Sequence, residues 1–540
     1  MAAATLSRHV SLAFLLFFSN LLFFLPSPSS SAASPSAIDD FVSCLLSANI
    51  PADQVLTPTS TSFISVLTSS VQNARFATSS SSNATSPACI VAASDVAHVQ
   101  SAVRCGRRHV IRLRVRSGGH DYEGLSYRSL RSDDVFAVLD LARLRAVRVR
   151  AGDATAWVES GATLGELYYS IGKSNPGFAF PGGACPTVGV GGYLSGGGIG
   201  LMMRKFGLGA DNVLDAMLVN ADGDVLDRGR MGEDLFWAIR GGGGESFGVV
   251  VSWRIKLSMV PSTVTVFNIA KTVSGDGAAV AALAKWENLI LQPFMPELTI
   301  RVVLQGNTAL FQSLYIGGCG RLAASMDAYF PELGMSRSDC NELTWLRAMA
   351  FITTGNITAP PEDMLRRTNN LGTSVKSKSD YVRRAIGATA WTSLFTNWLS
   401  RNNNGILILE PHGGVVGAVV PDYATPYPHR AGVLYNVQYG VFWWGDDGVN
   451  AARRWLDGVY EEMGPLVSSD PREAFVNYRD LEIGENEIGE DGLTTYESGR
   501  RWGERYFMGN FRRLAVVKGR VDPGDYFRNE QSIPPLFQSY

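Results

Sequence analysis

The hydrophobic pattern of the first half of the chain is one of short apolar runs. From about residue 89 to residue 257, β-branched runs alternate with stretches of helical spacing and with clusters of glycine. The pattern predicts strands over 90–92, 110–115, 135–139 and 156–158, and helices over 95–105 and 164–174. A short helix is predicted before this region, over 39–48, and a surface loop over 78–86. These elements describe an α+β region that is dense in turns.

After about residue 260 the glycine clusters thin out and the runs become longer. Strands are predicted over 263–272, 299–305, 311–316, 405–409 and 433–444, and a helix over 277–291. A chain of 540 residues exceeds the roughly 250–300 residues that one hydrophobic core supports. We therefore expect two lobes, over 33–260 and 261–470, and a structured closing segment over 471–540.

Residues 1–32 have the layout of a secretory signal peptide. A basic residue precedes the apolar run over 10–25, and small residues follow it. A transmembrane anchor is the alternative, but it needs about 20 unbroken apolar residues, and Ser19 and Asn20 interrupt this run. We expect cleavage, followed by a monomeric protein in the extracellular or cell wall space that does not associate with membranes.

The overall composition narrows the class of partner. Hydrophobic residues make up 46% of the chain and charged residues 18%, which is ordinary for a globular protein. The formal net charge of −2 provides no long-range attraction to nucleic acid or to an anionic membrane. Composition therefore favours an enzyme that acts on a small molecule, or a binding protein, and argues against a nucleic acid partner.

Three glycine-rich motifs carry the candidate chemistry. The first, RSGGHDYEG at 116–124, contains His120, the second, over 180–200, contains Cys185, and the third is GGGGESFG at 241–248. Paired glycines let backbone N–H groups approach an anion such as a pyrophosphate. The second motif is not a Rossmann motif, because a leucine stands where the third glycine would fall. Together the motifs indicate a long, phosphate-bearing cofactor, although a tight turn with a structural histidine is the alternative for the first motif alone.

These motifs resemble those of the berberine bridge enzyme-like family of FAD-linked oxidoreductases. The histidine in RSGGH and the cysteine in CPTVG carry the resemblance, which runs from about Asp39 to Pro535. Within the family, the group 4 grass pollen allergens look most similar, over 114–130 and 525–535. The resemblance implies an α+β, two-lobed vanillyl-alcohol oxidase fold, with a PCMH-type FAD-binding domain over 33–260 and an α+β substrate domain.

The resemblance also implies how FAD is held. His120 would bond the 8α-methyl carbon of the flavin and Cys185 its C6 carbon, and imidazole and thiolate are nucleophiles able to add to an electrophilic ring. Asn529 resembles the family position that returns to the flavin. The remaining cofactor contacts are expected from Ser117, Gly118, Gly119, Gly189, Gly192, Ser195, Gly198 and the segment from Glu245 to Val249.

The substrate side is expected to come from the second lobe. The sequence NYRD at 477–480 resembles a family motif whose tyrosine faces the flavin and acts as catalytic base in several members, which would make Tyr478 the base here. A core tyrosine is the alternative. A phenol with a pKa of about 10 needs a cation or a hydrogen bond to act as base near neutral pH, and the sequence does not identify that group. Tyr122 and Gln438 match pocket positions that orient hydroxylated substrates.

Val188 matches the family position that controls access of dioxygen to the flavin, where valine is permissive and isoleucine or leucine is obstructive. It favours an oxidase that makes hydrogen peroxide. Four residues depart from family patterns, since Tyr193 replaces a histidine, Ile199 an aromatic residue, and His412 and Phe475 tyrosines. Ile199 weakens the case for a monolignol site, and Tyr193 leaves the electrostatics near the flavin open.

The six cysteines fit a chain that is secreted. If Cys185 holds the cofactor, five remain, and an odd number leaves one thiol unpaired. We expect a buried thiol at Cys89 and disulfides that join Cys44 to Cys105 and Cys319 to Cys340.

Two sequons, at Asn83 and Asn356, are usable for N-glycosylation in a secreted protein. Of the remaining histidines, His98 and His109 are expected to be structural, and no role is predicted for His429. No metal site is expected, because no cysteine or histidine pair has the spacing of metal ligands.

We expect an FAD-dependent alcohol oxidase. Tyr478 would remove a hydroxyl proton as hydride passes from the adjacent carbon to the flavin, and dioxygen would then reoxidise the flavin. A saccharide oxidised at its anomeric carbon is the first choice of substrate, because Tyr122, Gln438 and Tyr478 together resemble the carbohydrate-oxidising members. A phenolic alcohol of the monolignol type or an alkaloid is the second. A flavin-loaded secreted or pollen protein with little turnover, whose role is binding, is an alternative of another class.

Overall fold

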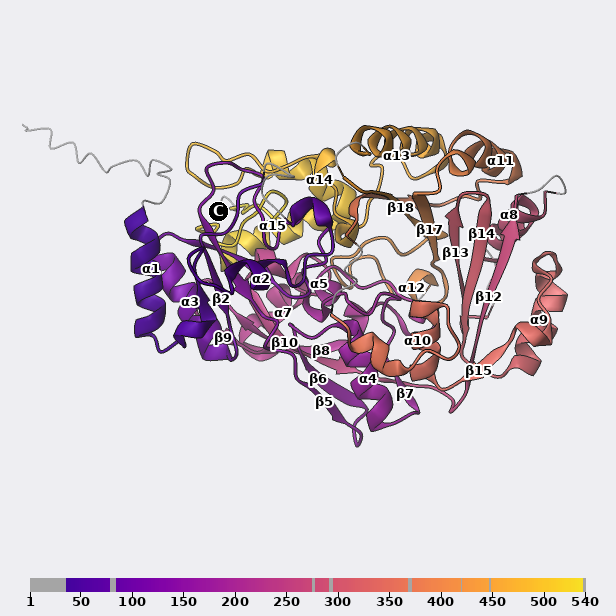
Figure 1. The fold of residues 1–540 in the computed structure, drawn as a ribbon, viewed down its shortest axis with the longest axis horizontal. Coiled ribbons are helices and arrows are strands. Elements are labelled where there is room, and N and C mark those ends of the chain that lie inside the picture. The colour runs from indigo at the N-terminus through magenta and orange to yellow at the C-terminus, as the bar shows by residue number, and fades with distance from the viewer. Residues whose placement is uncertain are drawn as a thin grey trace, which may run out of the picture.

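Short strands and glycine turns build the first half of the molecule, and long antiparallel strands build the second (Figure 1). The computed structural model describes residues 35–77, 84–273, 277–290, 295–367, 372–418, 420–445 and 448–537. The α+β class expected from the sequence is confirmed. The expected signal peptide over 1–32, most of the loop over 78–86 and the sequon at Asn83 lie outside the described residues.

A four-stranded sheet in the order β1-β2-β4-β3 leads into the first glycine motif. β4 pairs parallel with both β2 and β3, and β1 pairs antiparallel with β2. Helices α1 and α3 pack together beside this sheet, and the Asp95 side chain caps α3 by accepting from the His98 backbone N–H. The elements are α1 (Pro35–Ser47), β1 (Val55–Leu56), α2 (Phe63–Thr68), β2 (Cys89–Ala92), α3 (Val96–Arg108), β3 (Arg112–Arg116) and β4 (Phe136–Asp140).

The strand predicted over 110–115 begins two residues later than expected. Val110 has a φ of 58° and is 75% exposed, so it reverses the chain after α3 and does not pair in the sheet. A β-branched residue rarely adopts this left-handed conformation, which is why its β-branched side chain was wrongly counted with the strand. β3 ends at Arg116, directly before the turn that carries His120.

A five-stranded antiparallel sheet in the order β5-β6-β10-β8-β9 supports the second glycine motif. Helix α4 begins in a capping box, in which Thr163 and Glu166 satisfy each other's backbone N–H groups. The elements are β5 (Val147–Arg150), β6 (Thr155–Glu159), α4 (Leu164–Ser174), β7 (Phe178–Ala179), α5 (Val190–Ser195), α6 (Met203–Phe206), β8 (Val213–Val219), β9 (Val225–Leu226), α7 (Arg228–Ala238), β10 (Val249–Lys256) and β11 (Ser258–Met259).

A seven-stranded antiparallel sheet in the order β15-β12-β14-β13-β17-β18-β16 forms the second half. Buried tryptophans from α8, α11 and α13, which are Trp286, Trp391 and Trp455, pack on one face of it, and the other face looks toward the first half. The elements are β12 (Val264–Thr272), α8 (Ala278–Ile290), β13 (Leu298–Gln305), β14 (Thr308–Tyr315), α9 (Cys319–Tyr329), β15 (Asn341–Leu343), α10 (Trp345–Thr354), β16 (Ser374–Val382), α11 (Ala388–Asn397), β17 (Gly405–Pro411), α12 (Gly414–Ala418), β18 (Tyr435–Trp443) and α13 (Val449–Met463).

The C-terminal segment returns to the first half of the molecule. Helices α14 (Tyr496–Phe507) and α15 (Asn510–Val521) pack against each other, and α15 also packs on α7. Beyond α15, the chain runs beside β3, where the fully buried Glu530 accepts from Arg114 Nη1 at 2.9 Å. This buried ion pair holds the segment in place, since either charge alone would be costly to bury.

The cysteines are arranged as predicted. Disulfides join Cys44 to Cys105, which ties α1 to α3, and Cys319 to Cys340. Cys89 is fully buried in β2, and burial raises the pKa of its thiol to about 12. That thiol is therefore protonated at neutral pH and unreactive. Among the described residues, no helix has the length and apolar content needed to cross a bilayer.

Candidate active site

A cavity of about 520 Å³ lies between the glycine-rich loops, the open face of the seven-stranded sheet and the C-terminal segment. Its size is that of a site for a small molecule or cofactor. Most of the residues predicted for the site line it: Ser117, Gly118, Gly119, His120, Tyr122, Cys185, Val188, Gly189, Gly192, Ser195, Glu245, Gln438, Tyr478 and Asn529.

Four predicted cofactor residues do not line the cavity: Gly198 and, within the segment from Glu245 to Val249, Ser246, Phe247 and Val249. Val249 is fully buried in β10 and points into the core beside β2 and α3, while its neighbours Gly248 and Val250 face the cavity. Successive residues of a strand point to opposite faces of the sheet. The side chain of Val249 therefore points away from the cavity when that of Val250 points toward it. Gly198 packs against the Tyr193 ring, where an added Cβ would lie 2.6 Å from a ring carbon.

The first two glycine motifs touch backbone to backbone. A Cβ on Gly118 would lie 2.4 Å from the Gly189 nitrogen, and one on Gly189 would lie 2.3 Å from the Gly118 nitrogen. Any side chain at either position would push the two loops apart. The contact brings the His120 turn against the Cys185 loop, although the two motifs are distant in sequence.

His120 and Cys185 meet at one point of the cavity wall. The Cys185 Sγ lies 3.6 Å from His120 Nε2 and 3.3 Å from Thr187 Oγ1, and Thr187 Oγ1 lies 2.9 Å from the same His120 nitrogen. Burial alone would raise the pKa of the Cys185 thiol, but hydrogen bonds and the charge of His120, helped by Thr187, lower it to about 6. At neutral pH this cysteine is largely a thiolate, the form that acts as a nucleophile.

The residues present fit an FAD molecule. Its flavin would meet an imidazole and a thiolate side by side, which are the two nucleophiles that a doubly attached flavin requires. Next to them, a Cβ built on Gly192 meets no atom within 4 Å, so this backbone borders open space in the cavity. Glycine loops with this exposure suit the close approach of a phosphate-bearing chain.

Tyr122, Gln438 and Tyr478 come together at the end of the cavity nearest the seven-stranded sheet. Gln438 Nε2 donates to the Tyr122 hydroxyl at 2.8 Å, and the Tyr122 and Tyr478 rings meet edge to face at 6.4 Å between centroids. Burial raises the pKa of Tyr122 to about 12, so its hydroxyl keeps its proton. Two phenols and an amide therefore present hydrogen-bonding groups in one place.

The electrostatic surroundings of Tyr478 favour a neutral phenol. Burial is the largest effect and raises the pKa of Tyr478 well above its usual value, and the nearby Glu410 and Tyr122 raise it further. The Arg301 guanidinium is the cation that lowers it. Arg301 thus supplies the nearby positive charge that sequence reasoning could not name, but Glu410 opposes its effect.

Sequence reasoning missed Arg301 and Glu410 as lining residues of the cavity. The sequence pattern that could have identified them is a single charged residue within each of two otherwise apolar strands, β13 and β17. It also missed Thr187, which bridges the two nucleophiles, and the role of Arg479, which donates to Glu245 Oε1 at 2.9 Å. That bond ties the NYRD motif to the third glycine loop.

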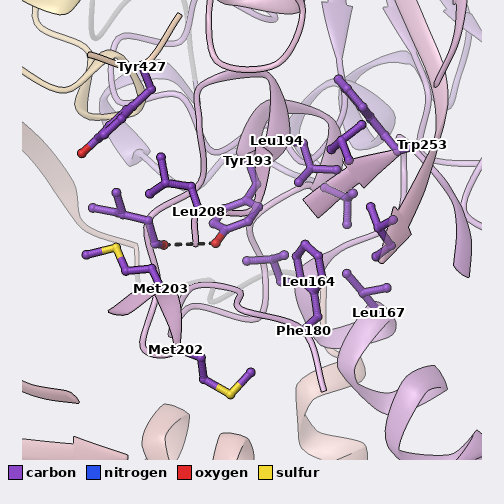
Figure 2. Packing of buried hydrophobic residues seen from close by; sticks show 14 of the residues in the cluster. Leu164, Leu167, Phe180, Tyr193, Leu194, Met202, Met203, Leu208, Trp253 and Tyr427 are labelled. Carbon is purple, nitrogen blue, oxygen red and sulfur yellow. Dashed lines mark hydrogen bonds between the residues drawn. The ribbon is translucent and has the colours of Figure 1, made fainter. Parts of the chain in front are cut away.

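Tyr193 and Ile199 line the cavity at two of the departures from family patterns. The Tyr193 ring lies among buried apolar side chains that include Leu194 and Leu208 (Figure 2). Its hydroxyl is 2.9 Å from the Pro181 carbonyl oxygen and 3.2 Å from that of Ile199. Burial raises the pKa of Tyr193 well above its usual value. Tyr193 therefore adds no charge near the cofactor and ties neighbouring loops together.

Phe475 contacts Tyr478, and His412 contacts Tyr427. His412 is buried with Nε2 2.8 Å from the Tyr427 hydroxyl, and burial lowers the pKa of its imidazole to about 3, so it is neutral. The ring of Phe475 packs edge to face on Tyr478 at 5.0 Å. Phe475 thus supports Tyr478 directly, His412 holds Tyr427, which packs on Phe475, and neither departure carries a charge.

The remaining histidines hold the fold together. His98 lies in the first turn of α3 beside Asp95, and His109 ends that helix. His429 is fully buried, with Nδ1 2.7 Å from Glu473 Oε2 and Nε2 2.9 Å from the Tyr506 carbonyl oxygen. Within the described parts of the chain, no group of three or more histidine, cysteine, aspartate or glutamate residues is arranged to hold a metal ion.

Two family descriptions match the chain. Residues 87–229 match the family described as FAD binding domain, and residues 474–534 match the family described as Berberine and berberine like. The first match covers the His120 and Cys185 motifs, and the second covers the NYRD motif and the C-terminal segment.

Known proteins resemble the chain over most of its length. Berberine bridge enzyme-like Cyn d 4 of Cynodon dactylon is 49% identical over 92% of this chain and 93% of its own. Berberine bridge enzyme-like 28 of Arabidopsis thaliana is 42% identical over 96% and 98%. The crystal structure of Phl p 4, described as a grass pollen allergen with glucose dehydrogenase activity, superimposes with a TM-score of 0.89 at 48% identity, over 92% of this chain and 100% of that one.

Proposed function

Because the chain belongs to the berberine bridge enzyme-like family of FAD-binding oxidoreductases, we propose that it is a secreted carbohydrate oxidase. Its substrate would be a saccharide with a free anomeric hydroxyl, and its FAD would be attached through both His120 and Cys185. Dioxygen would be the electron acceptor, with hydrogen peroxide as product.

One arrangement carries the proposal. Tyr122, Gln438 and Tyr478 converge at one end of the same cavity in which His120 and Cys185 lie side by side. Bound FAD would accept a hydride from the carbon that bears the substrate hydroxyl. Tyr478 would hold that hydroxyl and take its proton on the phenolic oxygen, while Tyr122, fixed by Gln438, would orient the neighbouring part of the substrate.

Two side chains support a double covalent attachment. Cys185 has a lowered pKa and is therefore largely a thiolate, and the adjacent imidazole of His120 is the second nucleophile. Attachment at two points would fix the flavin and leave the substrate end of the cavity open to a bulky sugar.

The solved structures of Phl p 4 support both the substrate class and the acceptor. The unmodified protein is described as a glucose dehydrogenase, and a variant with valine in place of one isoleucine is described as a glucose oxidase. A second substituted position, asparagine to histidine, lies five residues after that isoleucine, which is the spacing of Val188 and Tyr193 in this chain. We assign Val188 to that isoleucine position, so this chain would carry valine where the oxidase variant does.

Secretion is supported by two disulfides, which persist in oxidising compartments. Asn356 is exposed, with its side-chain oxygen accepting from the Thr358 hydroxyl at 2.8 Å, so the sequon is accessible to glycosylation.

Anaerobic reduction of the purified yellow protein tests the proposal. A panel of mono- and oligosaccharides and of aryl alcohols is mixed with it, flavin bleaching is followed, and air is then admitted for a peroxide assay. Fast bleaching by a sugar with rapid reoxidation is expected. Bleaching by aryl alcohols alone would point to a phenolic alcohol or alkaloid as substrate. No fast bleaching by any compound would point to a flavin-loaded protein whose role is binding.

A further inference from the structure

A row of polar side chains crosses the open face of the seven-stranded sheet at the cavity. Arg301 on β13 is the register partner of Gln312 on β14, and Glu410 on β17 is the register partner of Asn436 on β18. The two pairs are joined in the middle, where Arg301 Nη1 lies 3.3 Å from Glu410 Oε1. Charged side chains are rarely buried unless they are paired, and this pair lines the cavity.

Arg301 is fixed from behind. Its Nε donates to Gln312 Oε1 at 2.8 Å, and Gln312 Nε2 in turn donates to the Ile352 carbonyl oxygen at 3.2 Å. The side chains of Arg301 and Glu410 are 16% and 9% exposed, and both line the cavity. These hydrogen bonds therefore fix the orientation of the Arg301 guanidinium at the cavity wall.

The pair retains unused hydrogen-bonding capacity on each side. Among the residues that the structure describes, Arg301 Nη2 and Glu410 Oε2 have no hydrogen-bond partner. A donor and an acceptor thus stand next to each other at the cavity wall, and both charges are largely withdrawn from bulk water. Leaving such groups unpaired is costly when a ligand displaces the remaining water.

We propose that Arg301 and Glu410 are the specificity-determining pair for the substrate, binding two adjacent hydroxyl groups of an uncharged saccharide. This inference rests on the proposed carbohydrate oxidase function. The Glu410 carboxylate accepts from one hydroxyl group, and the Arg301 guanidinium donates to its neighbour.

The chemistry of the pair separates the candidate substrates. A pyranose carries hydroxyl groups on neighbouring carbons, each of which can donate and accept, so it satisfies both groups at once. An aryl alcohol with one hydroxyl group leaves at least one of them unpaired. A uronic acid places a carboxylate beside Glu410, which repels it. The pair also lies close enough to Tyr478 to act on it electrostatically, which places the recognised hydroxyl groups near the proposed base.

The experiment uses the flavin-loaded full-length protein and compares Glu410→Gln with the matched control Glu297→Gln. Glu297 also pairs with a cation, Lys205 at 2.6 Å, but does not line the cavity. Binding of 1,5-anhydro-D-glucitol, a glucose analogue without an anomeric hydroxyl and hence without turnover, is measured by calorimetry. Anaerobic flavin reduction is measured with D-glucose, its 2-, 3- and 4-deoxy derivatives and D-glucuronate.

The Glu410→Gln variant is expected to bind the analogue roughly 10- to 100-fold more weakly, the effect of losing one hydrogen bond to a charged group. Its preference for glucose over glucuronate is expected to fall at least about tenfold, since Arg301 is no longer neutralised and the repulsion is gone. A loss of packing alone would not move that ratio. The Glu297→Gln variant should match the unmodified protein in both measurements.

The deoxyglucose series keeps the inference testable if Glu410→Gln does not fold. Removal of at least one hydroxyl group should slow flavin reduction in the unmodified protein by about tenfold or more. Equal reduction by glucose and all its deoxy derivatives, or unchanged binding and sugar preference in a yellow Glu410→Gln protein, would overturn the pairing while the carbohydrate oxidase function stands. If no sugar bleaches the flavin, the proposed function fails first, and this inference with it.

Discussion

The ammonium group of Lys376 lies 2.8 Å from Asp480 Oδ1 and also contacts Glu123. Glu123 directly follows Tyr122, and Asp480 comes two residues after Tyr478. One buried lysine on β16 therefore joins the two loops that carry the tyrosines of the candidate site. Burial alone would lower the pKa of Lys376, but the surrounding carboxylates raise it above its usual value, so the lysine is charged.

Replacing this lysine should loosen both tyrosines at once. Lys376→Met removes the nearest cation from two buried carboxylates and leaves Asp480 with Lys378 at 3.1 Å and Glu123 with Arg75 at 3.8 Å. The loss should cost up to about 3 kcal/mol of stability, and flavin reduction by the substrate should slow. Lys376→Arg should restore part of both. Thermal unfolding and anaerobic reduction of the two variants measure this, with the exposed Lys173→Met as control. An unchanged rate of flavin reduction in Lys376→Met would show that the ion pairs of Lys376 do not position the two tyrosines.

Each covalent link should survive loss of the other. In His120→Ala and in Cys185→Ala the flavin is expected to stay with the protein after acid precipitation, and only the double variant should release it. The link through Cys185 needs a thiolate, and His120 is the main group that lowers the pKa of this thiol to about 6. In His120→Ala, burial raises that pKa with little opposition, so attachment through Cys185 should be slower at neutral pH than in the unmodified protein and should become faster as the pH rises. Release of all flavin from either single variant would show that only one bond forms.

Val188→Ile should slow reoxidation of the flavin by dioxygen and leave reduction of the flavin by the sugar nearly unchanged. A bulkier side chain beside the flavin is expected to slow reoxidation by dioxygen by at least about tenfold, which corresponds to about 1.4 kcal/mol in the barrier. Anaerobic reduction by the sugar should remain within about twofold. Stopped-flow mixing of the reduced protein with oxygenated buffer measures the effect. An equal rate of reoxidation in the variant would remove Val188 from control of dioxygen.

Reduction by substrate should become faster as the pH rises. Burial, Glu410 and Tyr122 raise the pKa of Tyr478, so the fraction able to accept a proton is small at pH 7 and increases toward pH 10 and above. Tyr478→Phe should lower the rate about 100- to 10,000-fold and abolish this dependence. A flat profile from pH 6 to pH 10 in the unmodified protein would contradict a proton-accepting role for this phenol in the chemical step.

Glu530→Gln should lower the free energy of unfolding above pH 4.5 and change it little in strong acid. Burial alone would raise the pKa of Glu530, but Arg114 lowers it from 4.5 to about 2. A lowered carboxyl pKa adds stability that is fully present above the unfolded value and is lost as the pH falls toward 2. The difference is about 3 kcal/mol at pH 7. Thermal unfolding of both proteins across this pH range measures it, and a constant difference down to pH 2 would argue against the ion pair as its source.

The cofactor end of the site was predictable because its signals are local. His120 and Cys185 each sit in a short motif with glycines that allow close backbone contact, and the motifs stand out without knowledge of the fold. Most strands and helices were predictable for the same reason, since their apolar residues recur at regular spacing. Val110 shows the limit, because residue type alone did not reveal its left-handed conformation.

The substrate end depends on contacts between distant segments. Arg301 and Glu410 are 109 residues apart and meet only because β13 and β17 pair. β16 was not predicted, because Lys376 and Lys378 give its sequence a polar pattern. Both lysines are buried, and the carboxylates that neutralise them come from elsewhere in the chain. A single sequence contains no sign of such pairing.

The return of the C-terminal segment to β3 sets an order of events during synthesis. His120 and Cys185 leave the ribosome long before Asn529 and Glu530. Asn529 lines the same cavity, and Glu530 holds the C-terminal segment in place through its ion pair with Arg114. A nascent chain shorter than 530 residues therefore exposes its two nucleophiles beside an unfinished pocket. The site is complete only after the C-terminal segment has been translated, so we expect the cofactor to attach after that point. Chains truncated before this segment should therefore accumulate without flavin.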